Sequence, residues 1–201
     1  MKKYFLLLCA VCLSLSLAAC SSTPKVTRVA EDEVIDLSGN WNDTDSRLVA
    51  EEMVQDSVKR PWLDNFIKTK QSKPRIIVGT ILNKSDEHIN TETFTKDLEI
   101  ALLNTGKATF VASKEQQAEI RQEKLDQADF SDPATVKKMG KELGADFMLK
   151  GQINTITDAV KNTTLKYYQV ELELIDIETA EKVWIGQKKI KKVVGKSKYK
   201  A

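Results

Sequence analysis

The chain has 201 residues, of which 41% are hydrophobic and 30% charged, so it is long enough for one domain with a substantial core. Its 31 basic and 29 acidic side chains give a formal net charge of +2, which excludes a general electrostatic attraction to nucleic acid. No nucleic-acid partner is therefore expected.

Residues 1–19 have the parts of a bacterial lipoprotein signal peptide. Lys2 and Lys3 precede an apolar stretch over residues 4–17, which is shorter than the roughly 20 residues that a membrane-spanning helix needs. The sequence Leu17-Ala18-Ala19-Cys20 then resembles a lipobox, in which the cysteine thiol is acylated before cleavage. We expect Cys20 to carry the lipid that anchors the chain to a membrane; an ordinary secretory signal is the alternative.

The remaining cysteines agree with this interpretation. Cys9 and Cys12 lie in the apolar part of the signal, so only Cys20 stays in the mature chain. A single lipidated cysteine leaves no disulfide, although the destination is oxidising. The domain must therefore be stabilised by burial alone.

Residues 20–42 are predicted to be the lipidated N-terminus and a short tether, and residues 43–195 a globular domain. A helix is expected from Asp43 or Asp45 to about Lys59, because apolar residues recur there at helical spacing. Pro61 should end it, and a short helical turn should follow.

Next, the β-branched run at residues 75–82 predicts a central strand buried on both faces. A helix over about 92–104 should end before Gly106, in the position of a left-handed cap. A short strand is expected over 107–112, and Ser113 and Gln116 form a capping box for another helix.

In the last third of the chain, Asp132-Pro133 predicts the start of a helix that closes at Gly144. Alternating apolar residues predict strands over 147–154, 168–174 and 183–194, the last two paired antiparallel. Residues 196–201 form a basic tail. This order predicts an α/β fold: a single sandwich with a mixed, mostly antiparallel sheet flanked by helices.

Residues 182–200 contain eight lysines. A solvated edge strand with a frayed tail accounts for them most simply, because edge lysines also prevent aggregation. The other interpretation is an electrostatic contact with phospholipid or with an acidic partner surface.

Catalytic chemistry has little support in this sequence. His88 is the only histidine, and neither a Gly-x-Ser-x-Gly elbow nor a glycine-rich phosphate loop occurs. We therefore expect no enzyme activity, no metal and no cofactor, and Asp86-Glu87-His88 is most simply a solvated loop. Trp41 is an isolated aromatic that either staples the tether to the domain or contacts a partner; stapling is favoured.

Several motifs carry a resemblance to a known family. They are Cys20 with its lipobox, Asp36-Leu37-Ser38-Gly39-Asn40-Trp41-Asn42-Asp43-Thr44-Asp45-Ser46-Arg47, Asn83-Lys84-Ser85-Asp86-Glu87-His88-Ile89-Asn90-Thr91, Leu102-Leu103-Asn104-Thr105-Gly106 and Gly144-Ala145-Asp146-Phe147. With them the chain resembles the LpoB-type penicillin-binding-protein activators over essentially its whole mature length. The last two motifs are shared with related envelope lipoproteins, including the curli-export lipoprotein.

The resemblance implies an outer-membrane lipoprotein facing the periplasm, folded like the N-terminal domain of the TolB translocation protein. It implies that the chain binds and stimulates a bifunctional penicillin-binding protein, acting as a monomer. The alternative is a structural or export-channel lipoprotein of the curli-export kind. Because loops on rigid scaffolds commonly carry contacts, Asn83, Glu87 and His88 are the candidate partner-binding residues.

Overall fold

The computed structural model describes residues 26–132, 134, 135, 137 and 144–195. The chain divides into two compact units, Met1–Glu33 and Val34–Ala201. In the first unit, residues 26–33 contain one turn and neither a helix nor a strand. All the helices and strands described below belong to the second unit. Residues 34–42, which were expected to be part of the tether, belong to the second unit together with the domain.

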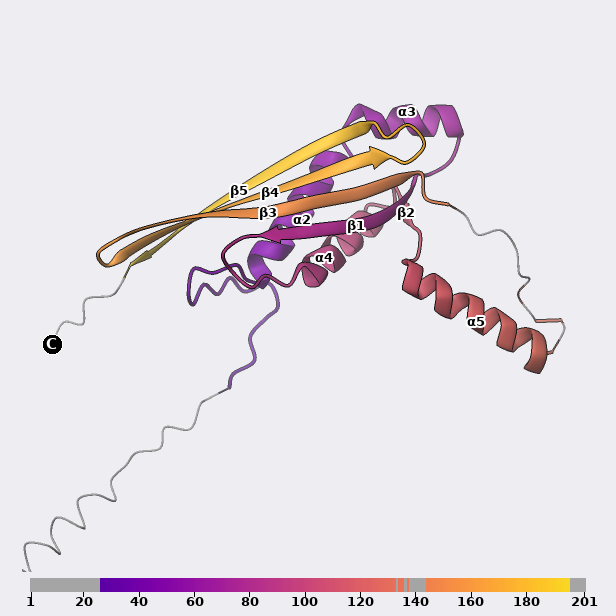
Figure 1. Cartoon of the computed structure of the whole chain (residues 1–201), viewed down its shortest axis with the longest axis horizontal. Coiled ribbons are helices and arrows are strands. Elements are labelled where there is room, and N and C mark those ends of the chain that lie inside the picture. The colour runs from indigo at the N-terminus through magenta and orange to yellow at the C-terminus, as the bar shows by residue number, and fades with distance from the viewer. Residues whose placement is uncertain (1–25, 133, 136, 138–143, 196–201) are drawn as a thin grey trace, which may run out of the picture. The chain divides into compact units, whose positions relative to one another are not determined.

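A five-stranded sheet with the order β2-β1-β3-β4-β5 forms the frame of the second unit (Figure 1). Its strands are β1 (Arg75–Lys84), β2 (Thr109–Phe110), β3 (Phe147–Val160), β4 (Thr163–Asp176) and β5 (Lys182–Gly195). β1 is parallel to β2 and β3, whereas β3, β4 and β5 are antiparallel. The mixed sheet and the antiparallel pairing of the last two strands are confirmed.

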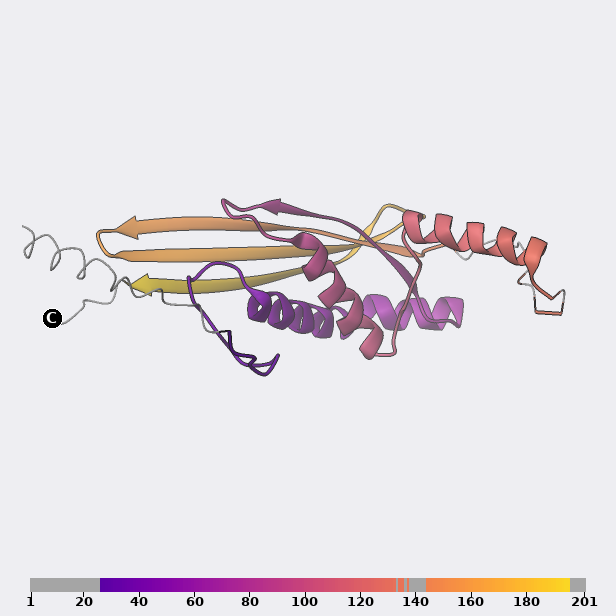
Figure 2. The ribbon, with the colours of Figure 1, turned by 90° about the horizontal axis from the view of Figure 1, so that it is seen from below.

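Four helices accompany the strands in the described part of the chain. They are α2 (Asp43–Ser57), α3 (Pro61–Lys70), α4 (Thr91–Asn104) and α5 (Lys114–Phe130). α2 packs against α4 and β5, and α4 also packs against β1, so both helices cover the same face of the sheet (Figure 2). The helix expected to start at Asp132-Pro133 falls largely on residues 133, 136 and 138–143, which lie outside the described residues.

The core lies between α2, α4 and the sheet face that they cover. Phe94 and Leu98 of α4 and Val49 and Ala50 of α2 are fully buried. The alternating β4 residues predicted to face inward are buried with them: Tyr168, Val170, Leu172 and Leu174. Burial of such side chains contributes about 25 cal/mol per Å² of apolar surface, which is the main stabilising term of a domain without disulfides.

The aromatic side chains of α3 attach that helix to the start of β3. Trp62 and Phe66 each lie with their ring centroid 5.2 Å from that of Phe147, in edge-to-face geometry. The predicted helical turn is therefore a full helix, with Pro61 at its first position. Trp62 is itself buried.

β1 differs from its prediction. It lies between β2 and β3, as a central strand should, but only Ile76 and Ile81 of its side chains are buried. The alternate residues Ile77 and Gly79 point to the other face and are half-buried. The β-branched run indicated burial on both faces, but within the described residues α2 and α4 cover only one face.

The three antiparallel strands extend beyond β1. The last residue of β1, Lys84, pairs with Asn154, whereas β3 continues to Val160. We call residues 155–168 and 189–195 the sheet end, and the face turned away from α2 and α4 its open face. In the described residues, no helix is long and apolar enough to cross a membrane.

Candidate functional site

The segment from Asp36 to Asn42 is fixed to the domain through the start of α2. The Asn42 side chain accepts a hydrogen bond from Asp45 N at 3.0 Å, and Asp45 Oδ2 accepts one from Asn42 N at 3.1 Å. This reciprocal capping box satisfies two backbone donors that the first turn of a helix leaves unpaired. The N-cap is thus Asn42, and the helix begins at Asp43, one of the two expected starts.

Trp41 staples this segment to the core. Its ring lies edge-on to Phe94 at 5.9 Å and to Tyr168 at 5.7 Å between centroids. Two residues earlier, Gly39 has φ +72°, and a side chain added there would collide with Cγ2 of Val194. Of the two roles considered for Trp41, the structure therefore provides the contacts of the stapling role.

Glu87 joins this segment to the loop between β1 and α4. Its Oε2 accepts a hydrogen bond from the Trp41 backbone N–H at 3.0 Å. Its Oε1 accepts one from Lys166 Nζ and another from the Tyr168 hydroxyl, each at 2.6 Å. The side chains of Lys166 and Glu87 are only 17% and 12% exposed, so this ion pair is shielded from solvent.

The pKa values of this cluster follow from its burial and its charges. Burial opposes ionisation of Glu87, but the hydrogen bonds from Lys166, Tyr168 and Trp41 outweigh it and lower the pKa of the carboxyl group. Burial, together with the hydrogen bond to Glu87, raises the pKa of the Tyr168 hydroxyl. Glu87 is thus held as a carboxylate and Tyr168 as a neutral donor.

Lys192 of β5 is a second polar anchor beside Glu87. Its Nζ donates to Asp36 Oδ1 at 2.7 Å and to Asp45 Oδ2 at 2.6 Å, and its side chain is 12% exposed. Burial disfavours the ammonium, yet the hydrogen bonds to Asp36 and Asp45 raise the pKa of Lys192 above its ordinary value. Residue 36 is therefore held against the sheet end by an ion pair.

Residues 83–91, which comprise the end of β1, the connecting loop and the first residue of α4, are linked by hydrogen bonds among themselves. The Asn83 amide donates to Glu87 O at 2.8 Å, and Asn83 Oδ1 accepts from Ser85 N at 3.0 Å. Asp86 accepts hydrogen bonds from the Thr155 and Thr157 hydroxyls at 2.5 and 3.0 Å, which tie the loop to β3. The loop is therefore held in one conformation before it meets any partner.

The three residues suggested for partner binding lie in this one segment, and the structure gives them different roles. Asn83 shapes the loop, Glu87 binds Trp41, Lys166 and Tyr168, and His88 is exposed. Cys20 lies outside the described residues. The sequence did not indicate Lys166 and Tyr168 as site residues, although the Asp36–Arg47 motif was a signal that this segment has a defined role. The described residues contain no group of three or more side chains suited to holding a metal ion.

The sequence of the chain matches one protein family, described as the peptidoglycan-synthase activator LpoB, over residues 45–190. Among curated proteins, none matches it. A solved structure with a similar fold is the LpoB C-terminal domain from Salmonella enterica, at 16% identity and a TM-score of 0.44, covering 73% of this chain and 98% of that one.

Two further solved structures are similar. The LpoB C-terminal domain from Escherichia coli has 18% identity and a TM-score of 0.40, covering 70% of this chain and 97% of that one. Lipoprotein GNA1162 from Neisseria meningitidis has 19% identity and a TM-score of 0.38, covering 63% and 88%. The family assignment rests on the sequence match, which spans most of the chain, from α2 into β5. The chain belongs to the LpoB family of peptidoglycan-synthase activators.

Proposed function

We propose that this protein is an outer-membrane lipoprotein, anchored through Cys20 and facing the periplasm, that binds and stimulates a bifunctional peptidoglycan synthase of the penicillin-binding-protein class. The observation that carries the proposal is the match to the activator family over residues 45–190. The lipobox at residues 17–20 supports the anchor. In this role the chain regulates cell-wall synthesis by binding, without catalytic groups of its own.

Activation by binding requires a higher affinity for the fast state of the synthase than for its slow state. A tenfold shift between two such states needs about 1.4 kcal/mol of differential binding energy. A few contacts on a rigid surface supply that amount, and a preformed loop loses little entropy when it binds. Residues 83–91 are such a surface, because their hydrogen bonds fix the loop in the free protein.

Within this loop the exposed residues are the proposed contacts and the buried ones hold them in place. His88 is exposed and follows directly after Glu87. Glu87 is bound by Trp41, Lys166 and Tyr168, so it positions the loop. We expect His88→Ala to weaken partner binding without unfolding the domain, whereas Glu87→Ala weakens binding by releasing the loop.

The direct test is polymerisation of lipid II by the cognate synthase, with and without the mature chain carrying Cys20→Ser to keep it soluble. At saturating concentration, the mature chain with its native loop should raise the rate of lipid II polymerisation. His88→Ala should increase the concentration of the chain that gives half of the maximal activation. Asn65→Ala, on the exposed side of α3, is the control and should behave as the wild type. An unchanged rate together with no binding would refute the activator role; activation that persists when Asn83, Glu87 and His88 are all alanine would refute only the choice of loop.

The anchor has its own test. Cys20→Ala should leave the signal peptide attached and abolish outer-membrane localisation, because the lipidated thiol is what processing and sorting require. Two or more acyl chains anchor stably where one is marginal, at about 0.8 kcal/mol per buried CH₂. Cys12→Ala is the matched control, a cysteine in the apolar part of the signal that should be processed normally. Cleavage before residue 20 in the Cys20→Ala chain, with the product in the membrane fraction, would contradict the lipobox assignment.

A further inference from the structure

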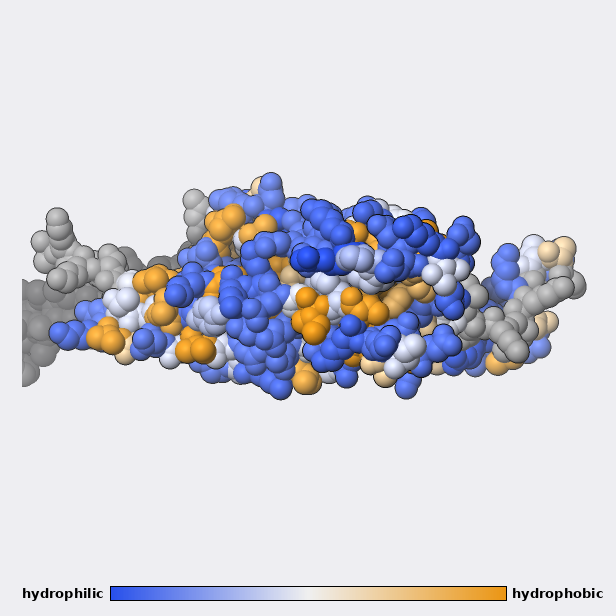
Figure 3. Space-filling model, turned by 90° about the horizontal axis from the view of Figure 1, so that it is seen from above, coloured by the Kyte–Doolittle hydropathy of each residue, from blue (hydrophilic) through white to orange (hydrophobic). Residues whose placement is uncertain are grey.

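The open face of the sheet end carries a cluster of exposed apolar side chains. Ile156, Val160 and Val193 are 65%, 66% and 68% exposed. The strand register places Ile156 opposite Tyr167 and Leu165 opposite Val193, so the five side chains share one face across three strands. Apolar residues are visible among hydrophilic ones at this end of the molecule in Figure 3. A cluster of this kind on a surface commonly marks an interaction site.

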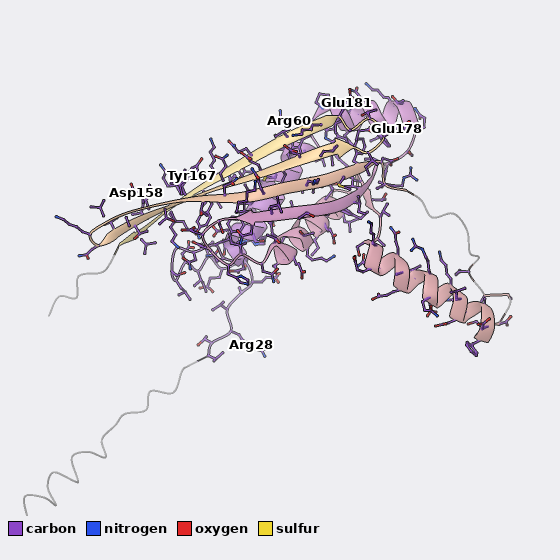
Figure 4. All side chains as sticks on the ribbon, viewed as in Figure 1. Arg28, Arg60, Asp158, Tyr167, Glu178 and Glu181 are labelled. Carbon is purple, nitrogen blue, oxygen red and sulfur yellow. The ribbon has the colours of Figure 1, made fainter. Side chains whose placement is uncertain are left out.

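Lysines surround the cluster. Lys161 lies in the β3–β4 turn, and Lys189 and Lys191 are exposed on the open face of β5. Asp158 also lies on this face, so the lysines outnumber the acidic group. At the other end of the sheet, by contrast, acidic and basic groups are mixed, because Glu178 and Glu181 lie there together with Arg60 and Lys182 (Figure 4). The apolar cluster therefore lies in a locally positive surface.

The N-terminal chain joins the domain at this same end. The compact unit begins at Val34, and Asp36 is bound to Lys192, which lies between Lys191 and Val193 on β5. Only residues 20–33 separate this junction from Cys20. Fourteen residues span at most about 50 Å. A membrane that holds Cys20 is thus within reach of the sheet end.

We propose that the open face of the sheet end docks on the anionic phospholipid surface of the membrane in which the lipid on Cys20 is inserted. The inference rests on the lipid anchor of the proposed function. The aliphatic side chains of the cluster enter the headgroup region of the bilayer, and the Tyr167 ring lies at the boundary between the bilayer and water. Lys161, Lys189 and Lys191 form ion pairs with lipid phosphates. The short tether keeps the sheet end at a high effective concentration near the surface, so weak docking is sufficient.

The first experiment measures docking without the anchor. The mature chain with Cys20→Ser is sedimented with vesicles of phosphatidylethanolamine and phosphatidylglycerol, and with vesicles of phosphatidylcholine alone. Binding should occur on the anionic vesicles and fall with salt. Lys189→Gln with Lys191→Gln should weaken it about 30-fold, at roughly fivefold for each lysine near an anionic surface. Lys68→Gln with Lys73→Gln, the same charge change at exposed positions outside the sheet end, should leave it unchanged.

The second experiment locates the contact. Because Cys20→Ser leaves the mature chain without cysteine, a single new cysteine can carry an environment-sensitive dye. Val193→Cys and Ile185→Cys are a matched pair, since both residues lie on the open face of β5 and are 68% and 61% exposed. On anionic vesicles the dye at position 193 should shift to the blue, and the dye at position 185 should not.

Each outcome separates docking from activation. No vesicle binding, binding that survives the Lys189 and Lys191 substitutions, or equal dye shifts at both positions would overturn the docking proposal. If the same substitutions instead abolish synthase binding while vesicles are never bound, the face belongs to an acidic protein partner. Lipid II polymerisation in detergent reports activation without a bilayer, so its failure would refute the proposed function and leave the vesicle result standing.

Discussion

Replacing Trp41 with alanine is expected to destabilise the domain, although the residue lies in a stretch that was predicted to be tether. The ring is partly buried and loses two edge-to-face contacts, with Phe94 and Tyr168. Each such pair contributes about 0.5–1.5 kcal/mol beyond burial. Burial of a large apolar side chain contributes about 1.5–3 kcal/mol when complete. For a partly buried ring, we expect a total loss of about 2–3 kcal/mol.

The assay is urea denaturation of the mature chain carrying Cys20→Ser, with and without Trp41→Ala. At an m-value of about 2–3 kcal/mol per M, the midpoint should fall by roughly 1 M. Leu37→Ala is the matched control, because Leu37 lies in the same segment and is 93% exposed. An unchanged midpoint for Trp41→Ala, or an equal fall for both variants, would refute the stapling role of Trp41.

Two further predictions concern the same junction. Gly39→Ala should lower the urea midpoint more than Gly106→Ala. Both residues have positive φ, but only the methyl group added at Gly39 would collide with Val194. Equal falls of the midpoint would show that the collision is relieved without loss of stability. Glu87 has a folded pKa below its unfolded value of about 4.3, so its stabilising contribution is present above that pH and is lost as the pH falls through the folded pKa. Below about pH 4.3, the free energy of unfolding should therefore fall more steeply for the wild type than for Glu87→Gln. The control Glu178→Gln, at an exposed position, should follow the wild type. Parallel curves of stability against pH for all three chains would contradict the role of Glu87.

Local sequence signals predicted much of the fold. The apolar spacing in α2 and α4, the capping box at Ser113 and the alternation in β4 each depend on residues a few positions apart, and each appears in the structure. Hydrogen bonds between i and i+3 or i+4, and the two-residue period of a strand, are set by local backbone geometry. Such features can be predicted from a sequence without knowledge of the fold. The lipobox is equally local, and Cys20 remains a prediction from the sequence.

The sequence predicted only part of the candidate site. It indicated the Asp36–Arg47 motif and the segment at residues 83–91, but not that the two are in contact. Glu87 is 79 residues from Lys166 and 81 from Tyr168, and no periodicity links positions that far apart. For the same reason, Glu87 was predicted to be a partner contact and its hydrogen bonds inside the domain were missed.

The sequence by itself therefore indicated where most of the helices and strands lie, but not the full length of α3, β3 and β4. Only the tertiary structure decided that β1 is the second strand with one well-buried face, and that β3, β4 and β5 extend past it. The structure also supplied the contacts for the stapling role of Trp41, because a ring on a polar segment becomes a core contact only when Phe94 and Tyr168 lie against it. Short-range patterns specify which face of an element is apolar, whereas what covers that face depends on contacts between distant segments.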